Sequence, residues 1–119
     1  MIGRLQAFVI DCPDTQALAA FYSELTGMPV SRVDDDGWVV VGPVGGPHLA
    51  FQHAPDHVPP QWPDPGHPQQ MHVDVLVHDI DAAEAAALAL GATRLAGHGD
   101  SFRVYADPAG HPFGLVHES

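Results

Sequence analysis

The chain has 119 residues, enough for about one globular domain, and 45% of them are hydrophobic. Four arginines, no lysine and fifteen acidic residues give a formal net charge of −11 when the nine histidines are neutral. This charge repels nucleic acids and anionic membranes, so neither is expected as a partner. A single cysteine excludes an internal disulfide, and no apolar stretch approaches the ~20 residues that span a bilayer. We therefore expect a cytoplasmic protein.

The first half of the chain predicts a strand, a helix and three further strands. Residues 5–11 form a short apolar run that is typical of a buried strand. Asp14 is placed to cap a helix with one apolar stripe, and Gly27 is placed to end it. The three extended segments that follow lie at about 29–33, 37–42 and 48–53, separated by turns.

The same pattern returns after a proline-rich segment at about 55–69, which has no periodicity and predicts a linker. A strand at 71–77 precedes a second helix, which Asp79 is placed to cap and Gly91 to end. Three more strands are predicted at 93–97, 101–106 and 112–118. Module one thus covers about 1–54 and module two about 70–119, and together they predict a single domain.

This repeat predicts an α+β fold, in which two paired βαβββ modules form a curled, cup-like mixed sheet with the helices on the outer face. Strand alternation places large apolar side chains toward the helices, among them Phe8, Phe51, Val75, Phe102 and Phe113. The opposite face is expected to carry His48, Gln52, His72, Asp74, Arg103 and Tyr105. A sheet face with such groups either meets solvent or lines a pocket.

Three segments of the sequence resemble the vicinal oxygen chelate superfamily. They are "DTQALAAFYSELTGMPV", "MHVDVLVHDIDAAEAAALALGA" and "YADPAGHPFGLV". This superfamily includes glyoxalase I, extradiol dioxygenases, and the bleomycin- and fosfomycin-resistance proteins. The resemblance covers nearly the whole chain and is closest to small glyoxalase-like domain proteins. It implies paired βαβββ modules, a bound small molecule, commonly a divalent metal, and a homodimer.

The resemblance also implies where a metal would bind, because metal-using members place ligands on the first, fourth, fifth and eighth strands. The matching positions here are Ala7, Ala50 or Gln52, His72 and Gly114. Only His72 keeps a usual ligand, so we expect no metal cofactor. A non-standard divalent site built from His48, His72 and Asp74, with Gln52 as a weak fourth ligand, is the alternative.

Seven residues are candidates for binding a small organic molecule: Trp38, His48, Gln52, His72, Asp74, Arg103 and Tyr105. Trp38 fits a pocket wall or the core, and Arg103 fits either an anionic ligand or a surface ion pair. The preferred function is a metal-free binding protein, similar to the resistance proteins that sequester an antibiotic. The alternative is a metal-dependent lyase, isomerase or dioxygenase resembling glyoxalase I, in which His72 is the catalytic residue, as metal ligand or general base.

Overall fold

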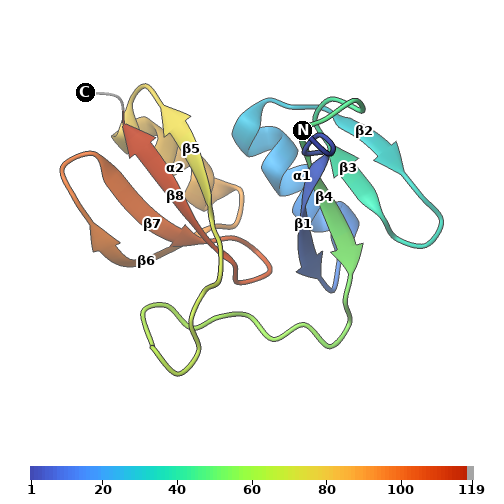
Figure 1. Ribbon diagram of the computed structural model, residues 1–119. Helices are drawn as coiled ribbons and strands as arrows, with labels where there is room; N and C mark the ends of the chain where they lie inside the picture. Colours follow the sequence, from blue (N-terminus) through green and yellow to red (C-terminus); the bar gives the residue numbers. More distant parts are fainter. Residues whose placement is uncertain (118–119) are drawn as a thin grey trace. The chain divides into compact units, whose positions relative to one another are not determined.

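The structure is a computed structural model that describes residues 1–117, and it divides into two compact units. Unit one is Met1–His57 and unit two is Val58–Ser119. Each unit has one helix and a four-stranded sheet that does not close on itself (Figure 1). Among the helices of residues 1–117, none is long and apolar enough to cross a membrane.

Unit one contains β1 (Ala7–Cys12), α1 (Thr15–Thr26), β2 (Val30–Val33), β3 (Val39–Val41) and β4 (His48–His53). Its strand order is β1-β4-β3-β2, with β1 parallel to β4 and the other pairs antiparallel. Asp14 caps α1 by accepting a hydrogen bond from the Ala17 amide at 3.0 Å. Gly27 ends the helix with φ of 74°, a left-handed conformation that favours glycine.

Unit two contains β5 (Val73–Val77), α2 (Ile80–Ala89), β6 (Thr93–His98), β7 (Phe102–Ala106) and β8 (Pro112–His117). Its order, β5-β8-β7-β6, repeats that of unit one, again with the first pair parallel. Asp79 caps α2 through the Ala82 amide at 3.1 Å, and Gly91 follows the helix with φ of 112°. The α+β class and the two βαβββ modules are therefore confirmed. The last residue of the strand predicted at 112–118 lies outside the described residues.

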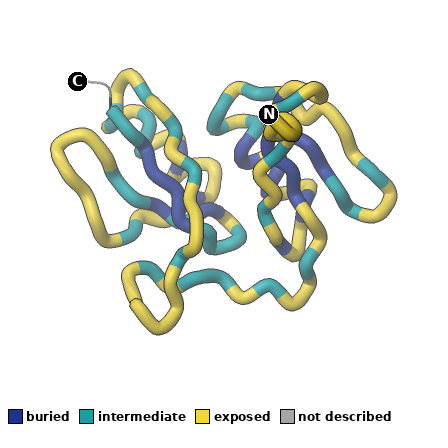
Figure 2. Tube along the Cα trace, viewed as in Figure 1, coloured by how far each residue is buried: buried dark blue, intermediate teal, exposed yellow. Residues whose placement is uncertain are grey.

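The core of each unit lies between its helix and its central strands, where Figure 2 shows the buried segments. In unit one, Leu18, Phe21 and Tyr22 of α1 are buried, and the Tyr22 ring stacks on Phe51 at 5.7 Å between centroids. In unit two, Tyr105 stacks on Phe113 at 5.5 Å, while Ala87 is the buried residue of α2. Helix α1 therefore contributes several large side chains to its core, whereas α2 contributes only a small one to a core formed mainly by the sheet.

One predicted strand face is wrong. Tyr105 pairs with Phe113 and Arg103 pairs with Leu115 across the antiparallel β7–β8 ladder, and directly opposed residues share a face. Arg103 and Tyr105 therefore lie on the helix side, while Phe102, which is 41% exposed, lies on the other face. The physical reason is that both side chains bury an apolar body and extend a polar tip to acids of α2.

Candidate functional site

The predicted site residues fall into three groups. Trp38 and His48 line a cavity of unit one, and Gln52 is exposed further along β4 on the face of His48. His72 and Asp74 are exposed at the start of β5 in unit two. Arg103 and Tyr105 contact helix α2, so they lie on the sheet face opposite to the one predicted for them.

The cavity of unit one has a volume of about 450 Å³ and lies on the sheet face opposite α1. The register places its strand residues together, because Ala7 pairs with His48 and Arg32 pairs with Val40. Its apolar lining comes from Leu5, Ala7, Val9, Trp38, Val40 and Val44. Its polar lining comes from Arg4, Gln6, Arg32 and His48. The arrangement combines an apolar wall with a few polar groups, as ligand pockets do.

His48 is held in one orientation at the base of this cavity. The residue is 7% exposed, and its Nδ1 lies 2.9 Å from the carbonyl oxygen of Pro43. A carbonyl can only accept, so Nδ1 carries a hydrogen, and in the neutral ring Nε2 is then an acceptor. Gly42, at φ of 111°, permits this packing, because a Cβ there would lie 3.2 Å from the His48 Cβ.

A larger cavity, of about 760 Å³, lies at the start of α1 and contains none of the predicted site residues. Two of its three acids already serve local turns: Asp14 caps α1, and Asp36 accepts a hydrogen bond from the Trp38 amide at 3.0 Å. Apart from Pro13 and Ala17 its lining is polar or glycine, so it offers little apolar surface to an organic ligand. We therefore take the smaller cavity as the candidate site.

His72 and Asp74 form the second predicted group. His72 Nε2 lies 3.2 Å from Asp74 Oδ1, and both side chains are about half exposed. Gly114 pairs with Asp74 on the neighbouring strand β8, and a Cβ at Gly114 would collide with the Asp74 carboxylate. The carboxylate therefore occupies the space that a side chain at position 114 would need.

The residues present do not fit the divalent metal that the fold family implies. Ala7, Ala50 and Gly114 have no ligand atoms in their side chains, and Gln52, the alternative position on the fourth strand, offers an amide in place of the usual acid. Within residues 1–117, no group of three or more histidine, cysteine or acidic side chains is placed to hold an ion. The His72 and Asp74 side chains, which face one another, provide fewer ligands than a divalent site needs.

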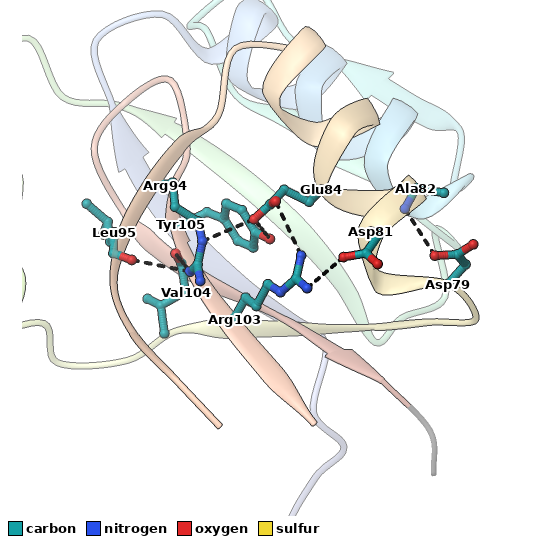
Figure 3. Close-up of polar contacts among 9 residues, drawn as sticks. All are labelled: Asp79, Asp81, Ala82, Glu84, Arg94, Leu95, Arg103, Val104 and Tyr105. Carbon is teal, nitrogen blue, oxygen red and sulfur yellow. Dashed lines mark hydrogen bonds and ion pairs between the residues drawn. The ribbon is translucent and has the colours of Figure 1, made fainter. Parts of the chain in front are cut away.

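The third group belongs to an ion cluster on the helix side of unit two (Figure 3). Glu84 of α2 accepts a hydrogen bond from the Tyr105 hydroxyl at 2.8 Å, and pairs with Arg94 at 3.0 Å and Arg103 at 3.2 Å. Arg103 also reaches Asp81 at 2.7 Å, and the Arg94 guanidinium lies over the Tyr105 ring. Burial, and then the bond to Glu84, raises the pKa of Tyr105 to about 12. These contacts connect α2 to its sheet.

Sequence reasoning missed Arg4 and Arg32 as cavity residues. Arg32 pairs with Val40, so side-chain alternation along β2 could have placed Arg32 on the cavity face. The register irregularity between Val30 and Arg32 interrupts that alternation. Arg4 precedes the first strand, where no periodicity applies.

Comparison with solved structures shows the same fold at low sequence identity. "Oxidase ChaP-H2" has a TM-score of 0.69 and 20% identity, and the match covers 100% of this chain and 96% of that one. TnmS3, an antibiotic binding protein from Streptomyces sp. CB03234, has a TM-score of 0.62 and 23% identity, covering 99% and 98%. A glyoxalase/bleomycin resistance protein/dioxygenase family enzyme from Burkholderia phytofirmans PsJN has a TM-score of 0.71 and 17% identity, covering 97% and 98%.

No curated protein matches the sequence. The model of the glyoxalase-like domain family, in contrast, matches residues 7–116, which runs from the first residue of β1 almost to the end of β8. The repeated βαβββ topology agrees with this match. The chain belongs to the glyoxalase-like domain family, within the vicinal oxygen chelate superfamily.

Proposed function

We propose that this protein binds a small organic molecule in the cavity of unit one and does so without a metal ion. The observation that carries the proposal is the cavity itself, whose volume of about 450 Å³ falls within the ~300–1,000 Å³ of ligand pockets. Its lining joins the Trp38 ring and the buried Val40 to the fixed imidazole of His48. An antibiotic-binding protein with this fold, TnmS3, is consistent with a binding role.

The metal-free part of the proposal rests on the ligand positions. Ala7 lines the cavity, and Ala50 is fully buried on the same face of the sheet. Neither side chain can coordinate an ion, so a ligand in this cavity is held by packing and hydrogen bonds. A chelator is therefore expected to leave both folding and binding unchanged.

The test fills the cavity and leaves the rest of unit one intact. Ala7→Leu adds three carbons at the cavity wall, while Ala20→Leu makes the same change on the exposed side of α1. We expect compounds that raise the melting temperature of the wild type to act equally on Ala20→Leu and to lose their effect on Ala7→Leu. Elemental analysis should find no stoichiometric Ni, Zn, Fe or Mn, and EDTA should not shift the melting temperature.

Two results would overturn the proposal. Compounds that stabilise Ala7→Leu as strongly as the wild type would place binding elsewhere on the chain. One equivalent of a bound transition metal, together with a melting temperature that falls in EDTA, would contradict the metal-free part. Circular dichroism of both variants establishes that the comparison is made between folded proteins.

A further inference from the structure

The charge of the unit one cavity contrasts with the charge of the chain. The chain has fifteen acidic and four basic residues, not counting histidine, yet two of the four arginines, Arg4 and Arg32, line this one cavity. No aspartate or glutamate belongs to its lining among the described residues. The lining of this cavity is therefore more positive than the chain as a whole, which favours anions over cations as ligands.

We propose that this cavity selects organic anions that have a flat apolar body, of which aromatic carboxylates are the simplest class. The inference rests on the proposed function, because it names the chemistry of the ligand for the same cavity. A carboxylate suits the two guanidinium groups, which present N–H donors in a planar fork. The aromatic body suits the apolar wall beside them.

The other two arginines, Arg94 and Arg103, each form ion pairs with acidic side chains of α2. Arg94 pairs with Glu84 at 3.0 Å, and Arg103 pairs with Asp81 at 2.7 Å and with Glu84 at 3.2 Å. Arg4 differs, because no acidic side chain within residues 1–117 pairs with it. Its charge therefore stays available to a bound anion.

Arg32 is partly engaged but keeps donors for a ligand. It contacts Asp34 at 2.8 Å through its Nε atom, which raises the pKa of Arg32 and keeps it charged. A guanidinium has four further N–H donors beyond Nε. Asp34 itself is outside the cavity lining, so the contact orients Arg32 and offsets part of its charge from behind the wall, and the remaining N–H donors stay available to a ligand.

The apolar wall explains why the ligand should be flat and aromatic. Trp38 provides a broad ring surface, and Val9 of β1 and Val40 of β3 lie on the same sheet face, on the two strands that flank β4. Aromatic rings stack on one another in offset or edge-to-face geometry, which gains free energy beyond the area buried. His48 adds one hydrogen-bonding nitrogen at the base, suited to a polar substituent of the ligand.

The experiment compares aromatic acids with their uncharged amides. Benzoate, 2-naphthoate and indole-3-acetate are each paired with the corresponding primary amide, and affinity is measured by calorimetry on the full chain. We expect each detectable acid to bind at least about threefold more tightly than its amide, an effect of the size typical for one exposed ion pair. Arg4→Gln and Arg32→Gln should each weaken acid binding about three- to tenfold and leave amide binding unchanged.

Arg94→Gln is the matched control, since it removes the same charge from the chain outside the cavity. It should leave the ratio of acid to amide affinity unchanged, with melting temperatures recorded for every variant. Amides that bind as tightly as acids, or arginine variants that keep the full acid preference, would overturn the inference. If binding nevertheless disappears in Ala7→Leu, the proposed function stands and only the ligand class is wrong. If no acid of the panel binds while neutral or cationic compounds do, the inference fails in the same way.

Discussion

Helix α1 of unit one and helix α2 of unit two occupy equivalent places in the same topology, yet they contact their sheets through different side chains. Helix α1 buries Leu18, Phe21 and Tyr22 against its sheet. Helix α2 is rich in alanine, buries Ala87, and reaches its sheet through the Asp81 and Glu84 carboxylates. The first helix therefore contacts its sheet through large apolar side chains, whereas the second combines one buried alanine with ion pairs.

This difference also separates the arginines of the two units. In unit two, Arg94 and Arg103 lie at the interface of helix and sheet, where they stabilise the fold (Figure 3). In unit one, Arg4 and Arg32 line the cavity on the face away from the helix. In the part of the chain that the structure describes, neither arginine of unit one contacts an acid of its helix: Arg32 pairs with Asp34 through Nε alone, and both arginines line the cavity.

The largest expected effect tests the apolar contact of α1. Leu18→Ala removes a side chain that is 2% exposed and should lower the free energy of unfolding by about 2–5 kcal/mol. Leu88→Ala makes the same change in α2 at a residue that is 43% exposed and should cost less than about 1 kcal/mol. Urea denaturation measures both. Equal losses in the two helices would contradict the contrast drawn between the units.

Local features of the fold could be predicted from the sequence, because they depend on neighbouring residues. Asp14 and Asp79 cap helices through amides three residues away, and the glycines after each helix adopt positive φ. The phase of β7 could not be predicted in this way. The sequence predicts that its side chains alternate between two faces, but not which face meets the helix. The polar tips of Arg103 and Tyr105 suggest the face away from the helix, because their partners on α2 are distant in the sequence.

The candidate site was predicted only in part, for a related reason. His48 lies in a strand and Trp38 directly precedes one, so the alternation of side chains along these strands predicts which face they occupy. Arg4 lies before β1, and its place in the cavity depends on the path of a segment without periodicity. Whether any of the seven predicted residues binds a ligand stays a prediction.

A second test concerns pH, because burial, and then the hydrogen bond to Glu84, keep Tyr105 protonated above its usual pKa. The pKa of Tyr105 is raised to about 12, whereas an unfolded tyrosine ionises near 10. Its contribution to stability is thus complete below pH of about 10 and is lost as pH rises through about 12. The difference in unfolding free energy between wild type and Tyr105→Phe should shrink across this window, by no more than about 3 kcal/mol. A difference that stays constant would show that Tyr105 ionises alike in both states.

The smallest effect removes one charge from the cluster. Glu84→Gln keeps the shape of the side chain but weakens its contacts with Arg94, Arg103 and Tyr105, and should cost about 1–2 kcal/mol because the side chain is 28% exposed. Glu24→Gln makes the same change at an exposed residue of α1 and should stay within about 0.5 kcal/mol. Denaturant titrations at neutral pH compare the two. If both variants are equally stable, α2 is held by its few apolar contacts, and the ion pairs in unit two add nothing to what packing provides in unit one.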